Sequence, residues 1–185
     1  RRRPEVRLTD FQSWAYRQVE IERRRVVVPV AARRSGKSTI ARLLAILAGL
    51  DDRPGDVGYM APTLEQARRL FWRPLMEDLR EPAARQFVMG RPDKGRMTLE
   101  FVTGTRLYLY SADAYERVRG DGFKLFITDE TDDPNFTPEV FDEAIRPALS
   151  DNLGMLLQLG TPKGRGRLFT EYRKGLAGDY RDPSY

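Results

Sequence analysis

A lysine and two consecutive carboxylates are the residues of this sequence best suited to phosphate chemistry. Lys37 lies in "AARRSGKST" at 31–39, and Asp129 and Glu130 end the stretch "LFITDE". The first stretch fits the phosphate-binding pattern G-x-x-x-x-G-K-[ST], except that Ala31 stands where the first glycine is usual. In such a loop the backbone N–H groups surround the β-phosphate, and the lysine ammonium reaches the β- and γ-phosphates. The sequence therefore predicts a site for a nucleoside triphosphate.

The alanine at the first position of the loop is compatible with this prediction. The first glycine helps the chain to turn, and alanine is disfavoured there only if φ is positive. Gly36 and Lys37 are harder to replace, and Ser38 is expected to offer its hydroxyl to Mg²⁺. A chance turn at the start of a helix is the alternative interpretation. The residues expected to bind nucleotide are Ala32, Arg33, Arg34, Ser35, Gly36, Lys37, Ser38 and Thr39.

The two carboxylates follow four strand-forming residues at 125–128. Successive side chains of a strand point to opposite faces, so the two acids can have different tasks. Asp129 is predicted to hold Mg²⁺ through its water shell. Glu130 is predicted to orient and polarise the water that attacks the γ-phosphate in line. An ordinary acidic strand end is the alternative, and the phosphate-binding loop earlier in the chain makes it less favoured.

The segments around the loop have the periodicity that the motif requires. The β-branched run at 24–31 predicts a buried strand, and the apolar spacing of 38–50 predicts a helix with Gly49 as its C-cap. A second strand is predicted at 56–63 and a second helix at 64–80, kinked or shortened by Pro74.

The rest of the chain continues the alternation of strands and helices. Residues 97–112 predict a hairpin that turns at Thr103–Gly104, and 124–130 and 155–161 predict buried strands with polar tips. Between them, 137–149 has helical spacing, with Thr137 as N-cap and Pro138 at the first position. This order predicts an α/β domain with a mostly parallel central sheet flanked by helices, plus an antiparallel hairpin. Polar strand ends then gather at the edge where such sheets bind ligands.

Composition narrows the possible chemistry. With 185 residues, 41% hydrophobic and 32% charged, the chain fits one folded domain. It has no cysteine and no histidine, which excludes disulfides, thiolate catalysis and histidine-based sites. The formal charge of +5 suggests an anionic partner, although ordinary surface arginines give a similar total. No apolar run is long enough for a membrane span and no signal peptide is visible, so a cytoplasmic protein without membrane contact is expected.

A carboxylate directly after the magnesium-binding aspartate is similar to the catalytic-glutamate branch of P-loop ATPases. Within that branch, nearly the whole chain resembles the ATPase domain of the large terminase subunit of tailed bacteriophages. The resemblance is carried in order by "FQSW", "AARRSGKST", "YMAPTLEQARRLFW", "VRGDGFKLFITDE" and "IRPALSDNLGMLLQLGTPKGRGRLF". Arginine-rich phosphate loops without the first glycine also occur in that family, which answers the question raised by Ala31.

The resemblance implies roles for further residues. Gln12 resembles the family's adenine-recognising glutamine, and Arg33 resembles an arginine that contacts the γ-phosphate or the acidic pair, while Arg34 is expected to face solvent. Arg119 matches an arginine supplied to a neighbouring subunit, with Arg117 as the competing candidate. Thr161 in "GTPKG" resembles the coupling residue that follows the state of the γ-phosphate. A solvated glutamine, a surface arginine and a capped turn are the respective alternatives.

The function implied by the resemblance is that of an ATP- and Mg²⁺-dependent motor. It would translocate double-stranded DNA into a procapsid as a homo-oligomeric ring, with the procapsid portal and the small terminase subunit as partners, in the host cytoplasm. The basic run at 163–175 and the start at 1–7 could follow a DNA backbone, although solvated arginines are the default.

The resemblance does not decide which domains the protein contains, and it leaves two alternative functions open. Large terminases continue into an RNase H-like nuclease domain, so 1–185 is expected to be the ATPase domain, with the lid subdomain absent or partial. Another translocase of the same branch, such as a helicase, is one alternative. A nucleotide-dependent switch without productive hydrolysis is the other.

Overall fold

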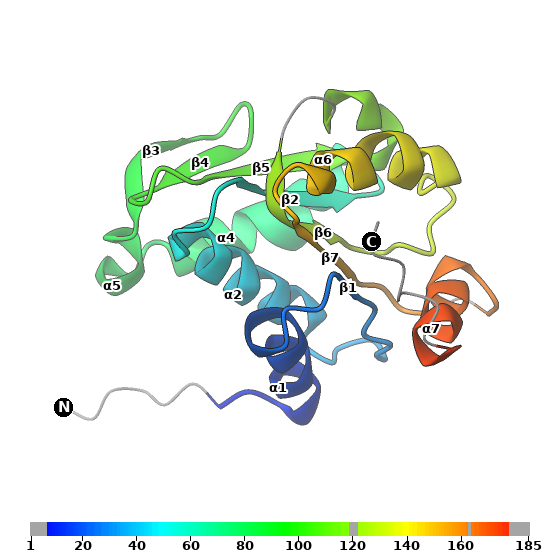
Figure 1. Ribbon diagram of the computed structural model, residues 1–185. Coiled ribbons are helices and arrows are strands. Elements are labelled where there is room, and N and C mark those ends of the chain that lie inside the picture. The colour runs from blue at the N-terminus through cyan, green and yellow to red at the C-terminus, as the bar shows by residue number, and fades with distance from the viewer. Residues whose placement is uncertain (1–6, 119–121, 163, 178–185) are drawn as a thin grey trace.

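The computed structural model describes residues 7–118, 122–162 and 164–177, which form one mixed sheet with helices on both faces (Figure 1). The sheet has seven strands in the order β1-β7-β6-β2-β5-β4-β3. Strands β1, β7, β6, β2 and β5 are parallel to one another, whereas β4 pairs antiparallel with β5 and β3 antiparallel with β4. The predicted fold class, including the antiparallel hairpin, is confirmed. The strands are β1 Val26–Val27, β2 Asp56–Ala61, β3 Val88–Asp93, β4 Thr98–Phe101, β5 Arg106–Ser111, β6 Phe123–Thr128 and β7 Met155–Gln158.

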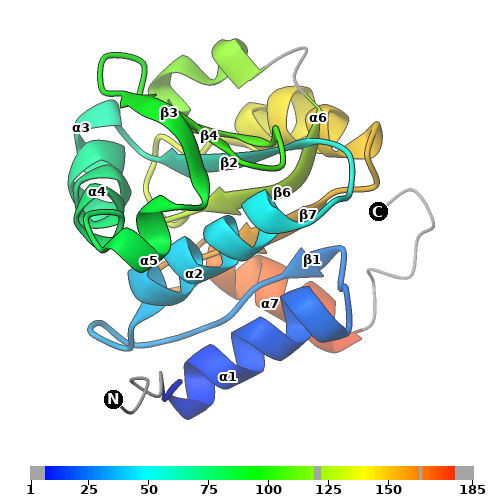
Figure 2. The same cartoon turned by 90° about the vertical axis from the view of Figure 1, so that its left-hand side faces the viewer.

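Two hydrophobic cores lie on the two faces of this sheet. One is built with α1, α2 and α4, and the other with η3, η4 and α6, as Figure 2 shows. Both cores share β6, whose six residues are all buried, because a strand between two helical layers has no solvent-facing side. The helices are α1 Asp10–Tyr16, η1 Arg17–Ile21, α2 Lys37–Leu50, α3 Leu64–Ala67, η2 Arg68–Trp72, α4 Arg73–Asp78, α5 Pro82–Arg85, η3 Ala112–Val118, η4 Val140–Ile145, α6 Arg146–Ser150 and α7 Arg167–Ala177.

The strand order decides which loops meet at the carboxyl edge. β7 pairs with β1 on one side and with β6 on the other, both in parallel. The loop that follows β7 therefore begins between the loop that follows β1 and the loop that follows β6. Residues from three distant parts of the sequence meet at this edge for that reason.

Both long helices with an internal proline contain a π-helical turn directly before the segment that carries it. The turn η2 directly precedes α4 with Pro74, and η4 directly precedes α6 with Pro147. Proline has no N–H and its ring collides with the carbonyl four residues before, so the preceding turn widens. The helix predicted at 64–80 thus continues through Pro74 and ends at Asp78, and residues 138–150 are helical from Pro138 onward, as predicted.

Two sequence predictions near the phosphate-binding loop need correction. The strand predicted at 24–31 forms ladder pairs only at Val26–Val27. Gly49 is not a C-cap, because α2 continues to Leu50 and Asp51 caps it in an extended conformation. A Cβ on Gly49 would lie 2.2 Å from the ring of Phe101, so this glycine makes room for packing and supplies no left-handed turn.

The sequence analysis predicted no element at the ranges of α1, η1, α5, β3, η3 and α7. β3 contains Gly90 with φ of 56° and Pro92, and both residues disrupt the alternation that identifies a strand. It lies at the edge of the sheet, where a proline is tolerated because one side of the strand needs no ladder partner. Within the described part of the chain, no helix has the length and apolar character needed to cross a membrane.

Candidate nucleotide-binding site

The loop between β1 and α2 has the backbone of a phosphate-binding turn. Gly36 precedes the first residue of α2 with φ of 83°, and Arg34 also has a positive φ of 63°. Ala31 keeps an ordinary negative φ, so the departure from the usual first glycine causes no strain. The left-handed conformation occurs later in the loop, at Arg34 and Gly36. An arginine rarely adopts it.

Lys37, the first residue of α2, is buried and surrounded by oxygen atoms. Its Nζ donates to the carbonyl oxygens of Ala31 at 3.3 Å and Ala32 at 2.8 Å, and to the Thr161 hydroxyl at 3.2 Å. Burial lowers the pKa of the Lys37 ammonium, while Asp129 and then Glu130 oppose that shift by attraction. The predicted lysine, acidic pair and coupling threonine thus lie within electrostatic or hydrogen-bonding reach of one another.

The two acids occupy different environments, but not for the reason given by strand alternation. β6 ends at Thr128, so both acids follow the strand, and Glu130 has a positive φ of 55°. This left-handed residue turns the chain, which leaves Asp129 buried and Glu130 only half-buried.

Asp129 is held from three sides. Its Oδ2 accepts from the Tyr59 hydroxyl at 3.0 Å, and its Oδ1 accepts from the Glu130 N–H at 2.9 Å. Its own N–H donates to the Met60 carbonyl at 2.9 Å. Burial raises the pKa of the Asp129 carboxyl, and the hydrogen bonds from Tyr59 and Glu130 work against that shift. A carboxylate fixed in this way is suited to bind a cation in one orientation.

The ends of β6 and β7 are tied together beside the acids. The Leu159 N–H donates to the Thr128 carbonyl at 2.7 Å. The Thr131 N–H and hydroxyl donate to the Leu159 carbonyl at 3.1 and 2.7 Å. Thr161 leaves this junction two residues after Leu159 and reaches Lys37. The tie between the ends of β6 and β7 therefore places Thr161 within hydrogen-bonding distance of Lys37 in the phosphate-binding loop.

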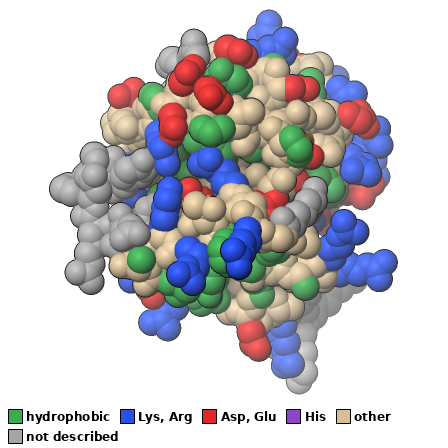
Figure 3. Space-filling view, turned by 90° about the vertical axis from the view of Figure 1, so that its right-hand side faces the viewer, with side chains coloured by type: hydrophobic (Ala, Val, Ile, Leu, Met, Phe, Trp, Pro, Cys, Tyr) green, Lys and Arg blue, Asp and Glu red, His purple; other side chains and the backbone are tan. Residues whose placement is uncertain are grey.

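A pocket of about 480 Å³ opens over these residues. Figure 3 shows the carboxyl edge of the sheet, with Lys and Arg side chains around a central hollow. Two of the lining residues, Arg69 and Leu70, were not expected from the sequence. They come from η2, and no local signal sets them apart from other residues of an amphipathic helix. The pocket is lined by Arg33, Arg34, Gly36, Lys37, Ser38, Thr39, Arg69, Leu70, Glu130 and Thr161.

Gln12 lies against the phosphate-binding loop, but both ends of its amide are already bonded. Its Nε2 donates to the Gly36 carbonyl at 3.3 Å, and its Oε1 accepts from the Thr9 N–H at 3.0 Å in a capping box. A Cβ on Gly36 would lie 2.4 Å from the Gln12 Nε2, so the glycine allows this close approach. Gln12 supports the loop in this structure, and its predicted contact with adenine stays a prediction.

The two candidate arginines for a neighbouring subunit are not placed equally. Arg119 lies outside the described residues. Arg117 is exposed near the end of η3 and is not among the residues that line the pocket. Their competing roles stay predictions.

The residues present fit a triphosphate with a magnesium ion. The Ser35 hydroxyl is buried without a hydrogen-bond partner in the described structure, within a loop whose type binds phosphate oxygens. In the described ranges no three acidic side chains cluster to hold a metal. Mg²⁺ is usually held by one or two protein ligands together with substrate phosphates and water, so two donors such as the predicted Asp129 and Ser38 would be enough to hold it.

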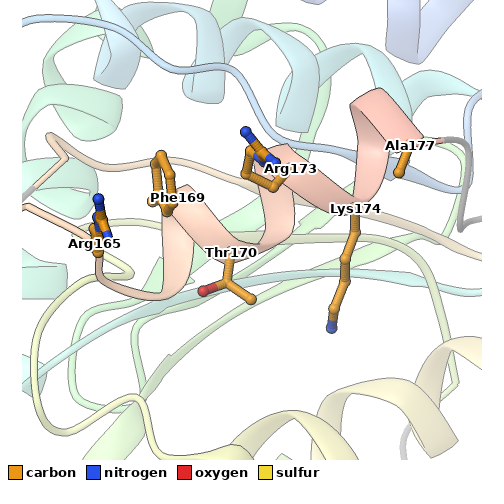
Figure 4. A pocket seen from close by; sticks show the side chains of 6 residues that line it. All are labelled: Arg165, Phe169, Thr170, Arg173, Lys174 and Ala177. Atoms are coloured by element: carbon orange, nitrogen blue, oxygen red, sulfur yellow. The ribbon is translucent and has the colours of Figure 1, made fainter.

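A second hollow of about 560 Å³ lies on α7, at some distance along the sequence from the phosphate-binding loop. Its charged side chains are all cationic: Arg165, Arg173 and Lys174. Phe169, Thr170 and Ala177 complete it, and Figure 4 shows these six side chains, five on α7 and Arg165 on the bend before it. This is the described part of the basic run noted in the sequence.

Solved structures with the same fold are large terminase ATPase domains of bacteriophages. The ATPase domain of the Thermus phage P74-26 large terminase is 27% identical with a TM-score of 0.67, and the match covers 90% of this chain and 74% of that one. A variant of the same domain gives a TM-score of 0.73 at 24% identity, covering 89% and 69%. The sequence-based resemblance is confirmed at the level of these structures. No protein-family model matches the sequence, and no curated protein matches it significantly.

Two other phage proteins extend the comparison. The large terminase of a thermophilic bacteriophage has a TM-score of 0.75 at 14% identity, covering 94% of this chain but 44% of that one. It has also been solved in complex with ADP and with ATP-gamma-S. The UvsW helicase of bacteriophage T4 is more distant, with a TM-score of 0.59 at 16% identity, covering 90% and 57%. At these identities the likeness shows a shared fold.

Proposed function

We propose that this chain is the ATPase motor domain of a DNA-packaging large terminase subunit, which hydrolyses ATP to move double-stranded DNA into a procapsid. The observation that carries the proposal is the meeting of Lys37, Glu130 and Thr161 at one pocket, with Asp129 fixed beside them. Three separate segments supply these residues, and each has the chemical type that phosphoryl transfer requires.

Binding of ATP begins with an exchange of partners at Lys37. The ammonium now donates to two loop carbonyls and to the Thr161 hydroxyl. Phosphate oxygens are stronger acceptors because they are charged, so the ammonium turns to them when the triphosphate enters. This reorientation of the ammonium breaks its hydrogen bond to the Thr161 hydroxyl, so the partner of Thr161 depends on whether the γ-phosphate is present.

Hydrolysis needs a positioned water and compensation of negative charge. Glu130 lines the pocket and accepts a hydrogen bond from the attacking water, which aligns it with the γ-phosphate. Asp129 and Ser38 would hold Mg²⁺, which would neutralise charge on the phosphate oxygens. The N-terminus of α2 presents backbone N–H groups to the same phosphates.

The working assembly is a ring of identical subunits. Arg119, or Arg117 in its place, serves a neighbouring subunit because a guanidinium remains charged and meets phosphate oxygens in bidentate geometry. The cationic side chains of α7 face the DNA backbone. The portal, the small terminase subunit and the host cytoplasm complete the setting. An isolated chain then hydrolyses ATP slowly, since it lacks the arginine of a neighbour.

The decisive experiment separates hydrolysis from binding. ATP turnover and ATP affinity are measured for the unmodified protein, for Glu130→Ala and for the control Glu77→Ala, whose side chain is exposed on α4. We expect Glu130→Ala to lose turnover and to keep ATP affinity, with the control unchanged. ATP binding without turnover in the unmodified protein, under all DNA conditions, would favour a nucleotide-dependent switch.

A helicase-like translocase is the alternative within the same fold, and the likeness to the T4 helicase favours keeping it. The two functions differ in the DNA that stimulates hydrolysis. Double-stranded DNA without ends to unwind stimulates a packaging motor, whereas single strands stimulate a helicase. Strand separation by the purified full-length protein would overturn the packaging proposal.

A further inference from the structure

The hydrogen bond between Tyr59 and Asp129 links the metal-binding region to the second strand of the sheet. Tyr59 lies in the middle of β2, fully buried, and its hydroxyl donates to Asp129 Oδ2 at 3.0 Å. The Asp129 N–H donates to the carbonyl of Met60, the next residue of β2. Main chain and side chain of Asp129 are thus both held by adjacent positions of one strand.

The tyrosine ring is itself held in place. Its centroid lies 4.1 Å from that of Phe71, which is also fully buried. Phe71 belongs to η2, the π-helical turn that carries Arg69 and Leu70 to the lining of the nucleotide pocket. A hydroxyl on a ring packed in this way has little freedom to turn away from the carboxylate.

We propose that Tyr59 is a positioning residue for the magnesium site, which fixes the Asp129 carboxylate in the orientation that binds the ion. This inference deepens the proposed function and rests on it. One oxygen of the carboxylate is held by Glu130 N–H and the other by Tyr59, and each oxygen retains a lone pair for a cation or its water shell. Partners of this outer kind orient metal ligands, and their loss commonly weakens metal binding about 10- to 100-fold.

The same contact makes η2 part of the site. A shift of η2 would displace the Phe71 ring, on which the Tyr59 ring packs. The pocket residues Arg69 and Leu70 and the magnesium ligand are therefore connected through two aromatic rings. A loosened Phe71 is expected to affect magnesium binding less than the loss of the Tyr59 hydroxyl, because the hydrogen bond remains.

The test measures magnesium-dependent binding of a slowly hydrolysed ATP analogue by calorimetry, so that no turnover is needed. Tyr59→Phe keeps the ring and removes the hydroxyl, and Phe71→Leu loosens the ring while keeping the hydroxyl. We expect the magnesium concentration at half-saturation to rise about tenfold in Tyr59→Phe and less in Phe71→Leu. Affinity for the analogue with excess chelator should stay within twofold of the unmodified protein.

Two further variants decide the outcome. Tyr110→Phe removes a hydroxyl from β5 in the opposite core and should leave the magnesium midpoint unchanged, whereas Asp129→Asn should abolish the magnesium effect. A normal midpoint in a folded Tyr59→Phe, alongside an impaired Asp129→Asn, overturns the positioning role and leaves the proposed function standing. Absence of magnesium-dependent nucleotide binding in the unmodified protein overturns both.

Discussion

Two buried lysines lie near opposite ends of α2, and both donate to backbone carbonyls and a threonine hydroxyl, but their roles differ. Lys37, at the first residue of the helix, donates to two backbone carbonyls and to Thr161. Lys124, in β6, donates to the carbonyl of Asp51 just after the helix at 2.8 Å and to the Thr105 hydroxyl at 2.9 Å. Burial lowers the pKa of both ammonium groups.

The two environments differ in helix polarity and in access. The C-terminal end of a helix attracts cations, so the helix end stabilises Lys124. The N-terminal end carries partial positive charge, so Lys37 adds a cation where an anion is preferred. Lys37 also lines an open pocket, whereas Lys124 is 1% exposed. A buried, fully hydrogen-bonded lysine can therefore bind an anion where a helix N-terminus favours negative charge and a pocket gives the anion access.

The comparison predicts its largest effect for Lys37→Ala. The variant should fold, because the loop and α2 keep their backbone bonds, but its affinity for ATP should fall about 10- to 100-fold, the value of one charged hydrogen-bonding group. Calorimetry with an ATP analogue measures the change. Lys94→Ala, an exposed lysine in a turn, is the matched control. Normal ATP binding by Lys37→Ala would remove the distinction between the two buried lysines.

The corresponding change at the other end of α2 should affect stability instead. Lys124→Ala leaves the Thr105 hydroxyl and the Asp51 carbonyl without this partner, and it opens a cavity under β6. We expect a loss of about 2–3 kcal/mol in the free energy of unfolding, measured by urea titration, with ATP affinity unchanged in the folded protein. A stable variant with impaired ATP binding would contradict a purely structural lysine.

Gln12→Glu sharpens the comparison at the loop around Lys37. Glutamate keeps the capping box with Thr9 but cannot donate to the Gly36 carbonyl. One neutral hydrogen bond is worth about 1 kcal/mol, so ATP affinity should fall roughly severalfold. Gln66→Glu is the matched control, because Gln66 forms the same type of box with Thr63 at the start of α3. Equal effects of the two variants would mean that added charge, and not the Gly36 contact, is responsible.

The smallest expected effect is a pH dependence of stability that comes from Lys124. Its pKa in the folded protein lies below the ordinary value of 10.5, chiefly because of burial. The folded chain therefore releases this proton at lower pH than the unfolded chain does, and stability rises as pH increases from the folded pKa to 10.5. The difference in unfolding free energy between the unmodified protein and Lys124→Met should grow in favour of the former as the pH rises toward 10.5. A constant difference would show that the folded lysine is not perturbed.

The fold and the candidate site could be predicted to different depths. The 3.6-residue and two-residue periodicities identified the main helices and the buried strands, because these patterns reflect burial on one or both faces. β3 and the helix η3 escaped detection, since Gly90, Pro92 and short helical turns give no periodic signal. Arg69 and Tyr59 escaped for another reason, because their importance depends on which strand lies next to which.

By itself, the sequence determined the chemical types and the local turns of this protein. The glycine-containing loop and the helix that follows it place Lys37 at a helix start, because the interactions that form this turn and helix are local. Only the tertiary structure decided that β7 lies between β1 and β6, which brings Thr161 to Lys37, and that β2 beside β6 brings Tyr59 to Asp129. Strand order depends on the packing of the whole sheet, and no local pattern encodes it.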